Sequence, residues 1–198
     1  MQTAQATTRG GRRLWLFRGM LLAGAALMLV SWFTPWWGAR VSDLIIPGNH
    51  IAMRPWGVEM IAEVAAYVDS AVYGMPAFFA PLMWLYLAAC MAALVVSLFL
   101  DKKIFLGQLE FSLPRVLIGI VGLSYLIAVV AAVVIAQWMA GDAGVRFFGS
   151  TTVYNPMTGG VSTITGTLRP GYWLAVAAGL VLIALALLRN SIVGRTAA

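Results

Sequence analysis

Residues Ser31 to Met60, SWFTPWWGARVSDLIIPGNHIAMRPWGVEM, determine how the rest of the chain is interpreted. The stretch begins inside an apolar segment, passes a cluster of tryptophans, and continues into a polar loop that contains His50, the only histidine of the chain. Residues 41–46 are mostly apolar and rich in β-branched side chains, Pro47-Gly48-Asn49 is typical of a turn, and an apolar run resumes at Ile51. We therefore predict a short β-hairpin in this loop.

The second half of the stretch changes its hydrophobic period after Trp56-Gly57. Apolar and polar positions then separate as they do on two faces of a helix, which predicts a short amphipathic helix over residues 58–69, lying at the membrane surface. Glu59 and Glu63 lie one turn apart on its polar face. Two carboxylates at this spacing can act as an acid/base or metal-binding pair, but we favour a solvated helix face.

The composition indicates an integral membrane protein. Of 198 residues, 62% are hydrophobic and only 10% are charged, whereas a soluble domain carries about 25% charged residues. Cys90 is the only cysteine, so disulfides within the chain and cysteine metal clusters are excluded. Although the net charge is +6, no basic cluster interleaves with aromatic residues, so we expect no nucleic-acid partner.

Four apolar segments are long enough to cross a bilayer, whose hydrocarbon core is about 30 Å thick. They lie at about residues 14–36, 78–100, 114–140 and 170–188. The first resembles a secretory signal, but no small-residue cleavage site follows it, so we expect it to remain as a span. Small residues along the spans, including Gly122 and Gly179, predict close packing of the helices.

The connections between the spans complete the expected fold. Residues 1–13 are expected to be a disordered cytoplasmic tail, and residues 101–115 a short cytoplasmic loop. The loop 141–169 is rich in β-forming residues and is split by Asn-Pro-Met-Thr-Gly-Gly, which predicts a second hairpin. The expected fold class is an all-α, four-helix membrane bundle, forming a single domain over residues 14–198. The outer loops 37–77 and 141–169 are expected to be ordered and to pair into one small β-sheet.

The basic residues predict the orientation of the chain in the membrane. Nine lie in the segments expected to be cytoplasmic: Arg9, Arg12, Arg13, Arg18, Lys102, Lys103, Arg115, Arg189 and Arg195. The other four lie in the expected outer loops: Arg40, Arg54, Arg146 and Arg169. The excess of positive charge favours cytoplasmic N- and C-termini in a multi-pass protein of the cell membrane.

The spans offer little chemistry, because they contain no Asp, Glu, Lys or His. Charged groups inside a membrane are the usual sign of proton relays and ion pathways, so their absence argues against a transporter working alone. The chain has none of the common hydrolase, nucleotide-binding or zinc-protease motifs, and no second histidine to act as a base. We therefore predict that the protein is not an enzyme and has no catalytic residues.

His50 is the one candidate for a metal or haem site. Together with Asn49, Met53 and Asp43 it could contribute to a copper site, or it could supply one axial ligand of a haem. The alternative is a histidine that fills a turn and hydrogen-bonds the backbone, and this is the interpretation we favour. We accordingly predict no metal and no cofactor held by the chain alone.

The tryptophans are candidates for a partner interface. Trp36 and Trp37 mark the far end of the first span, and Trp56 lies between Pro55 and Gly57, where we expect a loop anchored to the membrane or to a partner. Further aromatic residues could line a groove for a bound lipid, quinone or pigment, although packing within the bundle is the simpler interpretation. They are Trp84, Tyr86, Tyr125, Tyr172 and Trp173.

The layout resembles the claudin and PMP22-like tetraspan superfamily. The resemblance rests on Pro35-Trp36-Trp37 at the end of the first span, Trp56-Gly57 in the first loop, a short helix before the second span and a shorter outer loop after the third. It implies a small sheet built from the outer loops. The paired loop cysteines of that family are absent here, so the resemblance is one of layout.

Three functions follow as expectations. The first is a non-catalytic accessory subunit of a larger membrane complex of the respiratory, photosynthetic or membrane-oxygenase type. The alternatives are a metal- or cofactor-carrying membrane subunit that uses the His50 loop, and a self-assembling, claudin-like adhesion protein. The expected partners are membrane lipids and either other integral membrane subunits or further copies of the chain.

Overall fold

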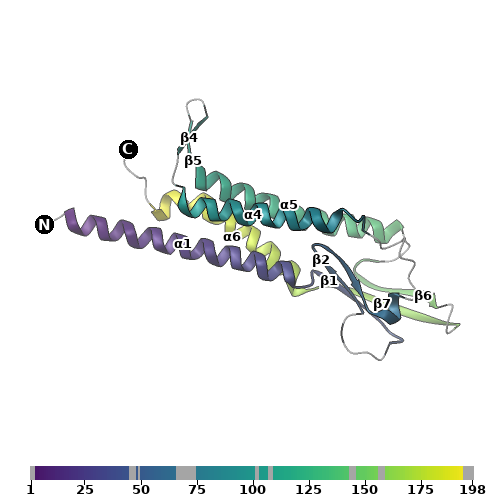
Figure 1. Ribbon diagram of the computed structural model, residues 1–198. Coiled ribbons are helices and arrows are strands. Elements are labelled where there is room, and N and C mark those ends of the chain that lie inside the picture. Colours follow the sequence, from purple (N-terminus) through teal and green to yellow (C-terminus); the bar gives the residue numbers. More distant parts are fainter. Residues whose placement is uncertain are drawn as a thin grey trace. The chain divides into compact units, whose positions relative to one another are not determined.

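A computed structural model describes residues 3–44, 48, 50–65, 75–100, 103–106, 109–142, 146–155 and 159–193 (Figure 1). This part of the chain contains four long helices, α1 (Thr3–Phe33), α4 (Phe79–Phe99), α5 (Leu113–Asp142) and α6 (Pro170–Val193). Each is long and apolar enough to cross a membrane, over Arg12–Phe33, Phe79–Phe99, Leu113–Gly141 and Pro170–Arg189. The prediction of four candidate spans is confirmed, and these helices indicate a multi-pass membrane protein.

Helix α1 differs from its predicted bounds at both ends. It begins at Thr3 rather than near Leu14, so most of the expected disordered tail is helical. Once a helix has nucleated, each further residue costs little, and the sequence before Leu14 contains no proline to stop it. The helix ends at Phe33 rather than at Trp36, because Pro35 disfavours helical dihedrals in the residue before it.

The chain divides into two compact units. The first consists of Met1–Leu29, Tyr86–Ile127 and Ala175–Ala198, and the second of Val30–Leu85 and Ala128–Leu174. Each long helix contributes residues to both units.

Close approach of small residues packs the helices of the first unit. A Cβ added to Gly122 of α5 would lie 2.9 Å from the backbone nitrogen of Ile183 and 2.9 Å from Cβ of Leu182, both in α6. A Cβ at Gly24 of α1 would lie 3.1 Å from the Leu182 side chain. Large apolar residues such as Leu187, which is 62% exposed, cover the outside. A helix that is apolar on all sides suits a lipid environment.

A short hairpin connects α4 to α5 in the first unit. Its strands are β4 (Lys103–Leu106) and β5 (Leu109–Ser112), which pair antiparallel from Lys103↔Ser112 to Leu106↔Leu109. We expected only a loop here. Gly107-Gln108, between two apolar runs, is a two-residue turn signal from which the hairpin was predictable.

The second unit contains a five-stranded sheet. Its strands are β1 (Trp37–Val41), β2 (Ile51–Arg54), β3 (Gly57–Met60), β6 (Gly149–Asn155) and β7 (Gly160–Leu168), in the order β3-β2-β1-β7-β6. All neighbouring strands are antiparallel. The pairing of β1 with β7, from Trp37↔Leu168 to Val41↔Ile164, joins the two long loops into one sheet. Both predicted hairpins and their association in one small sheet are confirmed.

Two details of the first loop correct the sequence-based prediction. The first strand is Trp37–Val41 rather than Val41–Ile46, because the chain enters the sheet directly after α1 in order to pair with β7. Ser42 and Asp43 already form a turn, and residues 45–47 and 49 lie outside the described part of the chain.

The predicted surface helix over residues 58–69 is the second correction. Gly57–Met60 is strand β3, which pairs with β2 from Ile51↔Met60 to Arg54↔Gly57. Helix α2 (Ala62–Ala65) follows, and residues 66–74 lie outside the described part. Val64 of α2 packs with Ala39 and Ile51 in a buried apolar cluster, so this helix covers one face of the sheet.

Candidate functional site at the helix-end tryptophans and the His50 turn

Trp36 joins three segments of the second unit. Its indole Nε1 donates a hydrogen bond to the Ser31 carbonyl oxygen over 2.9 Å, and its backbone N–H donates to the Met53 carbonyl over 2.9 Å. Its own carbonyl accepts from the Arg169 N–H, also at 2.9 Å. The Trp36 side chain is only 2% exposed, so the indole lies in the interior of the second unit. Our sequence-based prediction was that Trp36 is part of a partner interface.

Trp37 stacks on Phe147. The ring centroids are 4.8 Å apart with an interplanar angle of 10°, and the indole Nε1 donates a 2.8 Å hydrogen bond to the Phe147 carbonyl oxygen. Gly166 of β7 makes room for this contact, because a Cβ there would lie 2.5 Å from that carbonyl oxygen and 2.7 Å from the Trp37 ring. The half-buried Trp37 therefore holds the segment before β6 against β1.

Trp56 belongs to an aromatic cluster formed by Trp32, Phe33, Trp56 and Trp84. The Trp56 ring stacks on Trp84 with centroids 5.1 Å apart, and it lies 6.2 Å from Trp32 and 5.7 Å from Phe33. Trp32 is fully buried, whereas Phe33 and Trp84 are 57% and 41% exposed. Trp56 thus ties the β2–β3 turn to the ends of α1 and α4.

Arg54 supports the same turn. Its guanidinium carbon lies 5.6 Å from the centre of the Trp56 ring, within the range of a cation–π contact. The group also forms a 2.6 Å ion pair with Glu59. The prediction that Glu59 and Glu63 lie on one face of a single helix is wrong, because Glu59 is on β3 and Glu63 is on α2.

His50 closes the turn before β2. Its side chain is 3% exposed, and its Nδ1 accepts a 2.9 Å hydrogen bond from the Val41 N–H. The backbone N–H of His50 donates to the Ala39 carbonyl, and its carbonyl accepts from the Ile61 N–H. This is the backbone-bonded histidine of the interpretation favoured above, and the Nδ1 lone pair is already in use.

The other two residues proposed for a copper site also have roles in the sheet. The carboxylate of Asp43 accepts hydrogen bonds from the hydroxyls of Ser42 and Ser162. Met53 is 8% exposed and faces the same side of β2 as the buried Ile51. Among the residues described, no group of three or more His, Cys, Asp or Glu is placed to hold a metal ion.

The β6–β7 hairpin carries a feature that the sequence did not suggest. Tyr154 of β6 and Val161 of β7 are directly opposite in the register, and they are 69% and 67% exposed. Side chains at opposed positions lie on the same face of the sheet. In the described part of the chain β6 pairs only with β7, so its other edge presents backbone groups that have no strand partner there.

Comparison with protein-family models and with curated protein sequences finds no match to either. The fold and the site therefore identify the class of protein but not its family. The chain is a multi-pass membrane protein with four candidate spans and a five-stranded antiparallel sheet formed by two of its loops.

Proposed function

We propose that the protein is a non-catalytic accessory subunit of a larger membrane complex, contacting another integral subunit through its five-stranded sheet. The observation that carries this proposal is an ordered sheet with an exposed apolar pair, Tyr154 and Val161, beside the open edge of β6. Open strand edges and exposed aromatic residues are features of protein-binding surfaces. A chain that merely anchored itself in lipid would gain nothing from such a surface.

The proposed setting is the cell membrane, with both termini in the cytoplasm and the sheet outside. The excess of basic residues in the segments expected to be cytoplasmic supports this orientation. A respiratory, photosynthetic or membrane-oxygenase complex is the kind of assembly in which such a subunit would act.

The two alternative functions have less support. The cofactor-carrying function would need the His50 imidazole, whose Nδ1 already accepts the Val41 N–H. The claudin-like adhesion function draws on layout alone: the helices and the two-loop sheet are what that resemblance implies, but the loops lack its cysteines.

Purification from the native membrane in mild detergent tests the proposal. We expect larger integral subunits to co-purify in fixed ratio, as identified by mass spectrometry, and the isolated chain to show no haem absorption and no stoichiometric copper. Recovery of the chain alone or only as a homo-oligomer would contradict the accessory-subunit proposal. A Soret band or bound copper on the isolated chain would move the cofactor function into first place.

A pair of variants locates the contact. Tyr154→Ser combined with Val161→Ser removes the exposed apolar pair and should reduce co-purification of the partner at least about tenfold, because truncated aromatic contacts at an interface centre cost about 2 kcal/mol or more. Leu123→Ala is the matched control, since Leu123 is an apolar residue, 54% exposed, in the candidate span of α5. Equal loss of the partner in both variants would place the interface elsewhere.

A further inference from the structure

The hairpin between α4 and α5 forms a sheet of its own. Its strands β4 and β5 pair with each other, and in the described part of the chain neither pairs with a further strand. A two-stranded hairpin by itself is at best marginally stable in water, and it needs a surface against which one face can pack. An ordered β4–β5 hairpin therefore implies a surface that covers one of its faces.

The register of the hairpin separates its residues into two unlike faces. Positions that oppose each other share a face, and so do positions two apart along a strand. One face consists entirely of apolar residues, which are Ile104, Leu106, Leu109 and Phe111. We refer to this set as the apolar hairpin face. The other face has one apolar position and three polar or charged positions, and its residues are Lys103, Phe105, Glu110 and Ser112.

The position of the hairpin in the chain limits what can cover that face. The candidate span of α4 ends at Phe99 and that of α5 begins at Leu113, so β4 starts soon after one span and β5 ends directly before the other. Each strand has 4 residues, which extend about 14 Å at about 3.4 Å per residue. The headgroup layer adds about 5–8 Å to each side of the hydrocarbon core. A hairpin this short, joined to two spans, therefore lies in or beside the headgroup layer.

The direction of the hairpin agrees with a location at the bilayer surface. In Figure 1, β4 and β5 turn to the side of the adjoining ends of α4 and α5, which belong to the first unit together with the hairpin. Strands that continued along these helices would carry the apolar hairpin face away from the membrane into water. Strands that turn sideways keep this face level with the ends of the two candidate spans.

We propose that the β4–β5 hairpin lies in the bilayer interface, with the apolar hairpin face toward the acyl chains and the face that contains Lys103 and Glu110 toward water. Burial of apolar area in lipid provides the packing surface that a two-stranded hairpin lacks, as it does for the apolar face of an interfacial helix. The occupant of the face is lipid, so this contact needs no second subunit and is independent of the partner surface on the five-stranded sheet.

Two features keep the hairpin at this depth. The outer edges of β4 and β5 have no strand partner in the described part of the chain, and backbone groups without a partner are not tolerated inside the hydrocarbon core. Lys103 and Glu110 on the opposite face carry charges that remain in water. The hairpin therefore rests on the acyl chains without entering them fully, and it anchors the connected ends of α4 and α5 at the interface.

Spin labelling of the full chain in phosphatidylcholine nanodiscs tests the proposal. In a Cys90→Ala background, Ile104→Cys and Phe111→Cys place a label on the apolar hairpin face, and Phe105→Cys and Glu110→Cys place it on the other face. Oxygen concentrates among acyl chains and an uncharged nickel chelate stays in water, so the ratio of their effects on spin relaxation reports the surroundings of the label. We expect this oxygen-to-nickel ratio to be several-fold higher at positions 104 and 111 than at positions 105 and 110.

Phe105→Cys is the matched control, because Phe105 is a large apolar residue next to Ile104 in β4 but on the opposite face. Equal oxygen-to-nickel ratios at positions 104 and 105, or a higher ratio at 105, would overturn the proposal. Low accessibility to both reagents at positions 104 and 111 would mean that protein covers the apolar hairpin face, which would overturn lipid as its occupant.

A second set of variants shows whether the apolar hairpin face positions the hairpin. Ile104→Asn combined with Phe111→Asn removes much of the apolar area, and a label at Leu106→Cys should then lose its preference for oxygen. Phe105→Asn is the control on the opposite face and should leave the Leu106→Cys label unchanged, while the melting temperature of each variant checks that the helices stay folded. If the label keeps its preference for oxygen in the double variant, contact with lipid through this face does not hold the hairpin.

Discussion

At the scale of single residues, buried polar side chains in the second unit satisfy backbone groups of distant segments. The indole of Trp37 donates to the Phe147 carbonyl, 110 positions away in the sequence, and His50 accepts the Val41 N–H. An unpaired polar group in the interior costs about 1–3 kcal/mol, so each of these side chains both closes a gap and fixes a register. Both side chains therefore link segments that are far apart in the sequence or on opposite sides of a turn.

His50→Ala should destabilise the chain without changing its metal content. The substitution leaves the Val41 N–H without its acceptor, which should lower the free energy of unfolding by about 1–3 kcal/mol. His50→Asn is the matched variant, because its Oδ1 can reach nearly the same position as Nδ1 and should recover part of the loss. Thermal unfolding in detergent measures stability, and elemental analysis measures metal; loss of a stoichiometric metal on His50→Ala would revive the cofactor hypothesis.

Gly166→Ala should break the contact between Trp37 and Phe147. The added methyl group would lie 2.5 Å from the Phe147 carbonyl oxygen and 2.7 Å from the indole, so the ring must move and its hydrogen bond is lost. Overpacking of this kind costs about 1–3 kcal/mol. Gly57→Ala in β3 is the control, since no atom lies within 4 Å of its added Cβ.

Near-ultraviolet circular dichroism and the melting temperature report on Gly166→Ala. We expect a changed tryptophan signal and a lower melting temperature for Gly166→Ala, with little change for Gly57→Ala. If the two alanine variants have the same melting temperature, Gly166 is not the position that admits the stacked ring.

At the scale of secondary-structure elements, the segment after Trp56 shows that pairing between strands can outweigh the hydrophobic period of the local sequence. Val58 and Met60 fit one side of a strand as well as they fit a helix face. Strand β2 supplies a backbone partner for every residue of Gly57–Met60, and the Ile61 N–H continues the contact to the His50 carbonyl. The strand therefore prevails, and the helix starts only at Ala62.

Helix packing in the first unit should depend on Gly122. Gly122→Ala places a methyl group 2.9 Å from the Ile183 backbone nitrogen, which α5 and α6 can relieve only by separating, at a cost of about 1–3 kcal/mol. Gly119→Ala, almost one turn earlier in α5, meets only the Ala186 methyl group at 3.5 Å, an ordinary contact. Alanine also favours a helix over glycine by about 0.8–1 kcal/mol, so Gly119→Ala should be neutral or stabilising.

Resistance to denaturation by sodium dodecyl sulfate distinguishes these two glycine variants. Gly122→Ala should unfold at a lower detergent fraction than the unaltered chain, and Gly119→Ala at the same or a higher fraction. Equal destabilisation by both substitutions would show that helix flexibility, rather than close approach to α6, explains the glycines.

At the scale of the whole molecule, the sheet is ordered without disulfide support. Cys90, in α4, is the only cysteine of the chain. Hydrogen bonds between the two loops hold the sheet together instead: β1 pairs with β7 along five positions. Beyond the end of β1, the Ser42 N–H donates to the Thr163 carbonyl, and the Thr163 N–H donates to the Ser42 hydroxyl. The two loops therefore stabilise each other.

The orientation in the membrane gives the last prediction. In a Cys90→Ala background, Thr152→Cys on β6 should react with an impermeant maleimide added to intact cells, because the sheet is proposed to lie outside. Ser191→Cys near the end of α6 should react only after the membrane is opened. Both positions are exposed, so access across the membrane decides the result. Labelling of Ser191→Cys alone in intact cells would reverse the orientation.

The sequence by itself determined the features that depend on local composition. Apolar length specifies the four candidate spans, because a helix that must bury all its backbone groups in lipid needs about 20 apolar residues. The turn signals at Pro47-Gly48 and around Asn155–Gly160 likewise located two of the three hairpins of the sheet, whereas the β2–β3 hairpin was not predicted.

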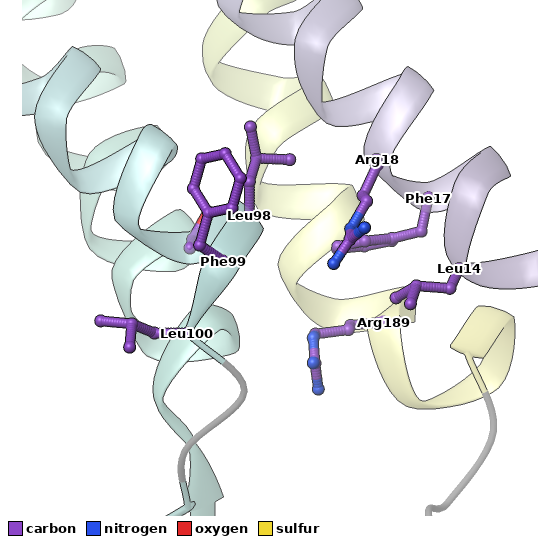
Figure 2. Close-up of a pocket in the computed structure, with 8 residues that line it drawn as sticks. Leu14, Phe17, Arg18, Leu98, Phe99, Leu100 and Arg189 are labelled. Atoms are coloured by element: carbon purple, nitrogen blue, oxygen red, sulfur yellow. The ribbon is translucent and has the colours of Figure 1, made fainter. Parts of the chain in front are cut away.

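Only the tertiary structure decided the roles of Trp36, His50 and Trp56. A tryptophan beside a span has the same local sequence whether it lies in lipid, on a partner or in the interior, and the pairing of β1 with β7 is what encloses Trp36. A pocket in the first unit, lined by residues of α1, α4 and α6, has the same origin (Figure 2). Arg18 and Arg189 are 171 positions apart and each resembles an ordinary residue at the end of a span, and helix packing makes them lining residues of one pocket.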